Sequence, residues 1–398
     1  MAENTKLFTP LKVGATQLDH RIVMAPLTRF RATTDHVPTP TMTQYYAQRA
    51  AAVPGTLLLT EATFISPRAG GYANIPGLWT PEQLAGWKAV TDAVHAHGGK
   101  IFCQLWALGR AAWPDPEGSG GAVRDDSGGF DFANDFCSAS DVPMADGLPA
   151  PRPLTDAEIG RFVEEYAAAA RDAVEKGGFD GVEIHAAHGY LIDQFTQDVS
   201  NRRTDAWGGS VEKRARFALE VAAAVGAAVG GADRVGIRLS PYSDFQGMRM
   251  AEGAIEPQFA YLIGELRRRR LVGYLHLVEP RVAGVVDRDP RGENLMWALE
   301  AWGREAPVLV AGGFTPELAR QAVEERYAGY EVAVVFGRRF ISNPDLVYRV
   351  KKGVELAPYD RFTFYINQKA GDKCEPGYID YPYSDEYVKE FGKPAEAV

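Results

Sequence analysis

The chain has 398 residues, of which 46% are hydrophobic and 24% are charged, and this balance is typical of a soluble globular protein. Its formal net charge of −9 argues against nucleic acid as the main partner. The three cysteines are scattered, which favours a reducing compartment over a disulfide scaffold, and no segment approaches the ~20 apolar residues of a membrane span. Because the start also lacks the apolar core of a signal peptide, we expect a cytoplasmic protein that does not enter membranes.

Short apolar segments alternate with helical patterns along the chain. The eight apolar segments are 22–25, 56–60, 101–105, 181–185, 235–239, 274–278, 308–311 and 332–336. Capping residues at Thr80, Thr155, Thr315 and Asn343 mark the starts of four of the intervening helices. Eight strand–helix repeats predict an α/β fold, a single parallel (β/α)8 TIM barrel. A doubly wound open sheet is the alternative, but the glycine-rich dinucleotide turn that usually opens it is absent from this sequence.

Two segments fall outside this repeat. Residues 107–153 contain many glycines and prolines but no strong helical pattern, and a connection this long in a compact domain is usually functional or disordered. It follows the third strand, so we expect it to cap the catalytic face. The tail 360–398 is rich in aromatic residues and is expected to pack back onto the barrel, so that residues 1–398 form one domain. Its aromatic residues are Phe362, Phe364, Tyr365, Tyr378, Tyr381 and Tyr383.

The segment 179–190 contains the most chemically informative residues. Strand side chains alternate between two faces, so Glu183 and His185 share one face of the fourth strand. His188 and Tyr190 follow where the strand gives way to a loop, the place where α/β folds hold their chemistry. A buried structural histidine is the ordinary alternative. A metal site is not expected, because it needs three or four protein ligands and nothing local supplies the rest.

Polar side chains also occur near the carboxyl ends of other strands. Gln104 and Trp106 share one face of the third strand, and Arg234, Gly236 and Arg238 share one face of the fifth. Unpaired polar groups in a barrel interior would cost folding free energy. We therefore expect a polar, anionic ligand in the mouth of the barrel.

The last two strands carry a phosphate-binding pattern. Gly312 and Gly313 follow strand seven, and Gly337 and Arg338 follow strand eight. Barrels commonly bind phosphate in these two loops through backbone N–H groups and an arginine. A pair of glycines alone is a weak signal, but its place after strands seven and eight strengthens it.

Together these residues resemble the old yellow enzymes, the flavin-dependent ene-reductases, and especially their fungal members. The resemblance covers nearly the whole chain. The matching segments are 25–29, 60–62, 104–109, 185–191, 201–205, 207–210, 336–338 and 341–346.

The resemblance implies a barrel that holds FMN non-covalently and takes its hydride from NADPH or NADH. It implies that Thr28 hydrogen-bonds the flavin, that Ala62 leaves room for the ring, that Gln104 pairs with the pyrimidine edge and that Arg238 stabilises the reduced, anionic flavin. The full implied cofactor set is Pro26, Leu27, Thr28, Ala62, Gln104, His185, Arg238, Gly312, Gly313, Gly337 and Arg338, of which the last four would take the phosphate.

The resemblance also implies the catalytic residues. His185 and His188 would donate hydrogen bonds to a carbonyl or nitro oxygen of the substrate, and Tyr190 would protonate the α-carbon after hydride reaches the β-carbon. The implied pocket walls are Tyr72, Trp106, Phe245 and Tyr365. In the fungal branch of the family an asparagine usually occupies the position of His188, so substrate preference is open here.

The sequence therefore predicts an FMN-dependent oxidoreductase that uses NAD(P)H to reduce the activated C=C bond of small α,β-unsaturated carbonyl or nitro compounds. Two alternatives stay open: a dedicated reductase or isomerase of a fungal secondary-metabolite pathway, and a flavin-binding protein without turnover. The presence of Tyr190 favours net reduction, because a binder or an isomerase needs no such proton donor. The sequence leaves the physiological substrate, the choice between NADPH and NADH, and the choice between monomer and homodimer open.

Overall fold

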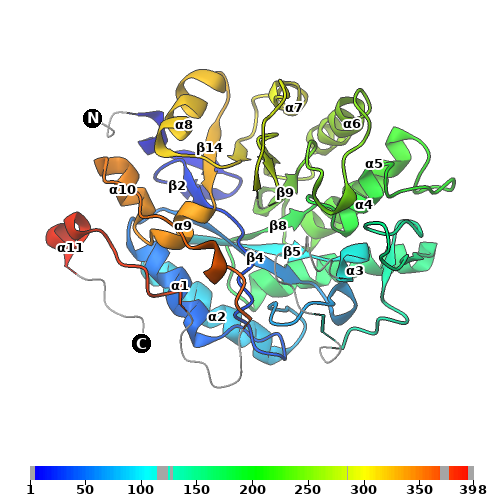
Figure 1. Ribbon diagram of the computed structural model, residues 1–398, viewed down its shortest axis with the longest axis horizontal. Helices are drawn as coiled ribbons and strands as arrows, with labels where there is room; N and C mark the ends of the chain where they lie inside the picture. Colours follow the sequence, from blue (N-terminus) through cyan, green and yellow to red (C-terminus); the bar gives the residue numbers. More distant parts are fainter. Residues whose placement is uncertain (1–4, 114–123, 126–128, 285, 368–375, 393–398) are drawn as a thin grey trace.

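The structure, a computed structural model, describes residues 5–113, 124–125, 129–284, 286–367 and 376–392. Eight parallel strands form a closed barrel in the order β10-β13-β14-β3-β4-β5-β8-β9. They are β3 (Ile22–Met24), β4 (Leu57–Phe64), β5 (Lys100–Trp106), β8 (Gly181–His185), β9 (Val235–Leu239), β10 (Tyr274–Val278), β13 (Val308–Ala311) and β14 (Val332–Phe336). Helices surround these strands (Figure 1). The predicted (β/α)8 barrel is confirmed, and each predicted apolar segment overlaps one of its strands.

The helices that cover the barrel follow the strands in the chain. Within the described residues they are α1 (Pro40–Ala51), α2 (Pro81–Ala96), α3 (Asp156–Glu175), α4 (Leu191–Thr196), α5 (Val211–Ala228), α6 (Ile255–Arg268), α7 (Met296–Trp302), α8 (Pro316–Gln321), α9 (Arg338–Ser342), α10 (Leu346–Lys352) and α11 (Asp385–Phe391). The apolar faces of α1 to α10 pack on the outer faces of the strands and build the largest hydrophobic core, whereas Tyr387 of α11 packs in a separate cluster with Tyr348 of α10. Every residue of β4 is buried, and a register shift against β5 between Leu59 and Ala62 lets this strand run past its predicted end.

Capping explains three of the four predicted helix starts. Thr80 and Thr155 each form a capping box, and the Thr315 side chain accepts a hydrogen bond from the Leu318 N–H. The prediction at Asn343 was wrong, because α10 begins at Leu346 with Asp345 as its N-cap. The Asn343 amide instead bonds to loop and helix backbone, including the Ala357 N–H at 2.8 Å.

The amino-terminal end of the barrel is closed by a hairpin of β1 (Leu11–Val13) and β2 (Thr16–Leu18), whose apolar residues pack against the starts of the strands. Arg234 lies at this end. It is exposed in a 3-10 turn, and β9 begins only at the next residue. In the alternating pattern Arg234 shares a strand face with Arg238, but four residues of rise along the chain separate the two, so Arg234 lies at the end of the barrel away from the mouth.

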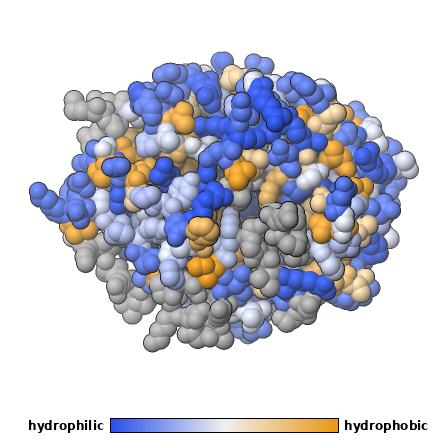
Figure 2. Space-filling view, viewed as in Figure 1, coloured by the Kyte–Doolittle hydropathy of each residue, from blue (hydrophilic) through white to orange (hydrophobic). Residues whose placement is uncertain are grey.

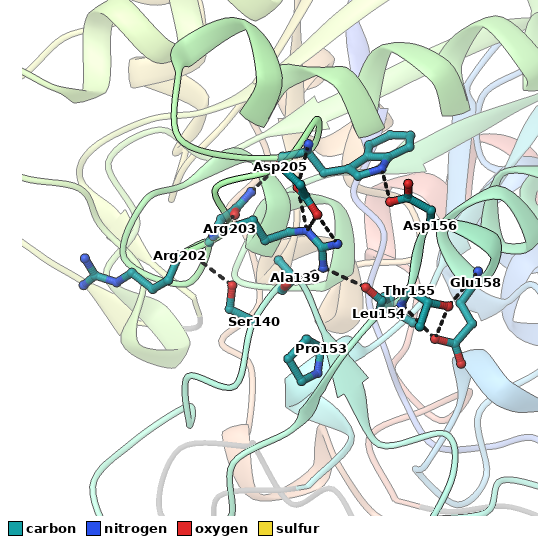
Figure 3. A network of polar contacts seen from close by, with 12 residues as sticks. Ala139, Ser140, Pro153, Leu154, Thr155, Asp156, Glu158, Arg202, Arg203 and Asp205 are labelled. Carbon is teal, nitrogen blue, oxygen red and sulfur yellow. Dashed lines mark hydrogen bonds and ion pairs between the residues drawn. The ribbon is translucent and has the colours of Figure 1, made fainter.

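The long connection after β5 is described only in part, and residues 114–123 and 126–128 of the predicted cap lie outside the described residues. Its described end forms a small sheet of β6 (Cys137–Ser138) and β7 (Arg152–Pro153). Arg203 ties this end to the barrel, since its guanidinium donates to the carbonyls of Ala139 and Leu154 and pairs with Asp205 (Figure 3). That the whole segment caps the mouth stays a prediction.

The described part of the tail packs against the segment after β3 and against α1. The buried guanidinium of Arg29 donates to the backbone carbonyls of Phe364 and Gly377, and the Tyr378 ring stacks on Tyr45 with centroids 4.3 Å apart. The helix α11 lies beside α10 at one edge of the molecule (Figure 1). Phe362 departs from the expectation of packing, because it is 93% exposed. That residues 1–398 form a single domain stays a prediction.

Among the described residues, the exposed large hydrophobic side chains are Val286, Phe362 and Phe391. On the face seen in Figure 2, hydrophobic residues form small separate groups among hydrophilic ones. No helix in the described part of the chain has the length and apolarity to cross a bilayer. Cys103 and Cys137 are buried free thiols, and Cys374 lies outside the described residues.

Candidate active site

A cavity of about 350 Å³ opens at the carboxyl ends of the barrel strands, where this fold holds its functional sites. The structure brings every candidate site residue of the sequence to this one cavity. The residues are Pro26, Leu27, Thr28, Ala62, Tyr72, Gln104, Trp106, His185, His188, Tyr190, Arg238, Phe245, Gly312, Gly313, Gly337, Arg338 and Tyr365.

Three rings from the end of β8 and its loop lie together on one wall. His185 is the last residue of β8, and Tyr190 is the N-cap of α4. Between them the chain turns sharply, with His188 at φ 57° and Gly189 at φ 77°. The ring centroids of His185 and Tyr190 are 4.9 Å apart, and those of His185 and His188 are 6.2 Å apart. One tight turn thus presents two imidazoles and a phenol to the same space.

Burial determines the protonation of these three side chains. Burial, together with the positive charge of Arg238, lowers the pKa of both His185 and His188 well below the usual 6.5. Burial also raises the pKa of Tyr190 above its usual 10, although the neighbouring Gln246 side chain opposes the shift. The two imidazoles are therefore neutral and the phenol holds its proton at neutral pH, so the wall offers hydrogen-bond donors without a net charge.

A buried polar network lies beneath the mouth, inside the barrel. The Glu183 carboxylate accepts hydrogen bonds from Gln104 Nε2 at 2.7 Å, the Tyr274 hydroxyl at 3.0 Å and His276 Nδ1 at 2.9 Å. Burial alone would raise the pKa of Glu183, but the charge and hydrogen bond of His276, with Arg238 and Gln104, lower it. This carboxylate is therefore ionised, and it holds the amide of Gln104 in a fixed orientation.

Tyr274 and His276 belong to this network but were not singled out in the sequence. Their alternation along β10 was the available signal, since Tyr274 and His276 share a strand face. Gly236 leaves the space that the tyrosine ring fills, because a Cβ there would lie 2.0 Å from a ring carbon of Tyr274.

The opposite end of the cavity carries the expected phosphate residues. Gly313 has φ 61°, and a Cβ on it would come within 2.8 Å of the Asp287 carboxylate and 3.4 Å of Arg338 Nη2. Arg338 itself forms an ion pair with Asp287, which lies on a hairpin of β11 (Val282–Ala283) and β12 (Val286–Asp287). Asp287 was missed because nothing in its local pattern places it across the cavity from Arg338.

These observations fit an FMN site. The Arg238 Nε atom is buried without a hydrogen-bond partner in the described structure, as expected of a group that awaits an anionic partner. Gln104 commits its amide N–H to Glu183, which leaves its carbonyl oxygen to accept from a ring N–H such as that of a flavin pyrimidine. At the other end of the cavity, glycines leave the backbone N–H groups accessible and an arginine supplies positive charge, and a phosphate group binds to both.

Comparison with known proteins identifies the family. Residues 6–357 match the sequence profile of the NADH:flavin oxidoreductase / NADH oxidase family. The chain belongs to this family. It is also 54% identical over 385 residues to a chanoclavine-I aldehyde reductase of Penicillium roqueforti, an alignment that covers 97% of this chain and 98% of that protein.

Two further proteins of this family are closely similar. The chain is 48% identical over 400 residues to a probable inactive reductase of Epichloe festucae var. lolii, with 98% of each chain covered. Among solved structures, the Old Yellow Enzyme from Pichia sp. AKU4542 matches with a TM-score of 0.82 and 35% identity over 100% of this chain and 96% of that one. The resemblance to the old yellow enzymes is thus confirmed, and with it FMN as the cofactor and NAD(P)H as the hydride donor of this oxidoreductase.

Within the described residues, no group of three or more histidine, cysteine, aspartate or glutamate side chains is arranged to hold a metal ion.

Proposed function

We propose that this protein is an ene-reductase that uses NAD(P)H to reduce the activated C=C bond of α,β-unsaturated carbonyl or nitro compounds. The single observation that carries the proposal is the wall formed by His185, His188 and Tyr190, where two neutral imidazoles lie beside a protonated phenol in the cofactor cavity. Polarisation of an oxygen and protonation of a carbon need these two kinds of group in one place.

In this proposal the imidazoles bind the substrate oxygen. His185 and His188 donate hydrogen bonds to the carbonyl or nitro oxygen, and these bonds strengthen as negative charge develops there during reduction. A reduced flavin held by Gln104, Arg238 and the phosphate-binding residues would supply the hydride that the β-carbon receives. The Tyr190 hydroxyl transfers its proton to the α-carbon and later regains one from water, so that the net change is addition of one hydride and one proton across the double bond.

The remaining walls orient the two reactants. Tyr72, Trp106, Phe245 and Tyr365 enclose the substrate side of the cavity with aromatic surface. Trp106 lies parallel to the His185 ring, with an interplanar angle of 14°, and meets the Tyr190 ring edge to face. Trp106 thereby fixes both rings relative to each other.

We further propose the cofactor roles that the resemblance implies. Pro26, Leu27 and Thr28 cover one edge of the flavin, and the Thr28 hydroxyl bonds to a flavin carbonyl. Ala62 leaves space for the ring, Gln104 accepts from the pyrimidine edge, and Arg238 stabilises the negative charge of the reduced flavin.

Gly312, Gly313, Gly337 and Arg338 bind the phosphate in this proposal. Their backbone N–H groups and the arginine supply the donors that a phosphate needs.

A second candidate function is supported by the names of the relatives. One similar protein is named a chanoclavine-I aldehyde reductase and another a probable inactive reductase, and these names support a dedicated reductase and a protein without turnover as the two alternatives. An α,β-unsaturated aldehyde is accordingly the first substrate class to test. We propose the cytoplasm as the location and a small molecule as the partner.

The proposal is tested by anaerobic titration in two steps. The purified protein with bound FMN is first reduced with NADPH or NADH, and flavin bleaching at about one equivalent is expected. Enals, enones and nitroalkenes are then added, and recovery of the oxidised flavin spectrum with formation of the saturated product is expected. Flavin that bleaches but is not reoxidised by any of these compounds would support the non-turnover reading.

A further inference from the structure

The two imidazoles of the site are useful as donors only if each carries its proton on the nitrogen that faces the cavity. A neutral imidazole has one N–H donor and one acceptor nitrogen, and the partner of one nitrogen determines which is which. The structure gives each ring a partner on Nδ1 only. Within the described residues neither His185 Nε2 nor His188 Nε2 has a hydrogen-bond partner in the protein.

The tautomer of His185 is fixed by the backbone. The Ala187 N–H donates to His185 Nδ1 at 3.4 Å. A backbone N–H can only donate, so Nδ1 must be the acceptor and the proton of the neutral ring must sit on Nε2. His185 therefore presents an N–H donor to the cavity without help from any other side chain.

The tautomer of His188 depends on a hydroxyl. His188 Nδ1 lies 3.3 Å from the Oγ of Ser243, a residue that is 2% exposed. A serine hydroxyl can donate or accept, so this contact by itself allows both tautomers.

A third group resolves the ambiguity. The Phe245 N–H donates to Ser243 Oγ at 3.4 Å, which fills an acceptor position of the hydroxyl. Ser243 Oγ forms no other side-chain hydrogen bond in the described part of the chain. If His188 Nδ1 also donated to this oxygen, the buried hydroxyl proton would have no acceptor, and such an unpaired group costs folding free energy. If the hydroxyl donates to Nδ1 instead, the hydroxyl proton, its oxygen and His188 Nδ1 are all paired.

We infer that Ser243 is a positioning residue that holds His188 in the Nε2–H tautomer, through a chain of donors from the Phe245 backbone to the Ser243 hydroxyl to His188 Nδ1. The inference rests on the proposed function, because it gives His188 its role as a donor to the substrate oxygen. Without the hydroxyl, the ring is free to place its proton on Nδ1 and turn a lone pair toward an oxygen that is gaining negative charge.

The same turn contains a matched control. Ser240 is also a buried serine, and its Oγ accepts from the backbone N–H of His188 at 2.7 Å. Loss of this hydroxyl disturbs the backbone of His188 but leaves the ring nitrogen and its partner in place. Ser243→Ala and Ser240→Ala therefore remove the same atom from neighbouring positions with different consequences for the tautomer.

The experiment measures the protonation of the ring nitrogens directly. The FMN-bound protein is labelled with 15N-histidine, and the His188 signals are assigned by their loss in His188→Gln. In the native protein we expect His188 Nδ1 to give the shift of an unprotonated nitrogen and Nε2 that of a protonated one. Ser243→Ala should move His188 toward a mixture of tautomers, whereas Ser243→Thr, which keeps a hydroxyl, and Ser240→Ala should not. The His185 signals should stay unchanged in all variants.

Ligand binding supplies the second measurement. para-Chlorophenol, whose phenolate resembles an enolate oxygen, is titrated into each FMN-bound variant. The loss of one hydrogen bond worth about 0.5–1.5 kcal/mol should weaken its binding roughly two- to tenfold in Ser243→Ala, with recovery in Ser243→Thr.

Two results would overturn the inference: a native His188 with its proton on Nδ1, or a Ser243→Ala protein with an unchanged His188 tautomer. A protein that binds no phenol but shows a Ser243-dependent tautomer would support the positioning role and contradict the proposed function, so the two failures are distinguishable.

Discussion

Trp106 and Tyr190 meet edge to face, with ring centroids 4.7 Å apart and an interplanar angle of 86°. This contact holds the phenol of Tyr190 between the indole and the imidazole of His185, whose centroid is 4.9 Å away. The hydroxyl therefore lies at a fixed place on the cavity wall, where a proton donor to a bound substrate has to be.

Tyr190→Phe keeps this ring packing and removes only the hydroxyl. We expect reduction of the flavin by NAD(P)H to stay near its normal rate, because hydride transfer to the flavin needs no acid. Reoxidation by a simple enone should slow by ~10²–10⁴-fold, the usual contribution of a placed general acid. Nitroalkenes should be affected less, since a nitronate is stable enough to leave and be protonated in water. Stopped-flow measurement of each half-reaction checks this, and equal slowing of both would remove Tyr190 from the mechanism.

The imidazole pair gives a second prediction. Replacing both His185 and His188 with alanine should abolish the long-wavelength charge-transfer band that para-substituted phenols form over bound FMN, because the phenolate oxygen loses both donors. FMN should remain bound, since its phosphate and pyrimidine partners are untouched. Absorbance titration measures the band and the flavin content together. An undiminished band would mean that the oxygen is held elsewhere, and loss of the flavin would make the histidines structural.

The ion pair between Arg338 and Asp287 gives a third prediction. Asp287 is 62% exposed and pairs with the arginine that we assign to the FMN phosphate, so its carboxylate competes with the phosphate for that arginine. Exposed ion pairs contribute about 0.2–1 kcal/mol, so Asp287→Asn should bind FMN about 1.5- to fivefold more tightly.

The measurement for Asp287→Asn is quenching of FMN fluorescence by the apoprotein. Asp289→Asn is the control, because it removes an exposed negative charge two residues away, and within the described residues the Asp289 side chain accepts only from the Arg291 backbone. Equal tightening in both variants would indicate a general charge effect, and weaker binding in Asp287→Asn would contradict competition.

A fourth prediction concerns acid stability. His20 is buried at the amino-terminal end of the barrel, where its Nδ1 accepts from the Ile22 N–H and its Nε2 lies 2.9 Å from the Thr56 hydroxyl. Burial, with the charge of Lys351, lowers the pKa of His20 to about 4. The unfolded chain, with a pKa near 6.5, then binds more protons than the folded one, so the contribution of His20 is complete above pH 6.5 and is lost as pH falls toward 4.

This loss amounts to about 3 kcal/mol over that window. Urea unfolding between pH 7 and pH 4 should therefore show a flatter acid dependence for His20→Gln than for the native protein. Burial raises the pKa of Glu61 to about 7 and of Asp193 to about 6, so these two carboxyl groups stabilise the folded state as the pH falls, opposite to His20. Because both groups are present in the native protein and in the variant, their effect cancels when the two stability curves are compared. Parallel curves for the two proteins would contradict the prediction.

The barrel was predictable from the sequence because its strands are short, apolar and separated by well-capped helices. Thr80 and Thr155 form the expected capping boxes, and alternation alone places Gln104 and His185 toward the inside. Where alternation was extended beyond a strand end, as for Arg234, it failed, because the chain there is already a turn.

Partners across the cavity could not be predicted from local pattern. Asp287 lies on the hairpin after β10 and Ser243 in the loop after β9, and each reaches its partner, Arg338 or His188, because the barrel brings the ends of different strands together. The resemblance to the old yellow enzymes points to residues that members of the family share. It does not point to Ser243, because the proposed role of this serine depends on His188, where the fungal members usually have an asparagine.

Closure of the barrel also has a consequence for protein synthesis. The first barrel strand, β3, pairs with the last, β14, and Tyr365 adds a wall of the cavity still later in the chain. At ~5–20 residues per second, roughly 15–60 s separate the translation of these two strands, and β3 waits with one edge unpaired. Cofactor loading is thus an event at the end of translation, and a stalled or truncated chain would expose an incomplete sheet to chaperones instead of binding flavin.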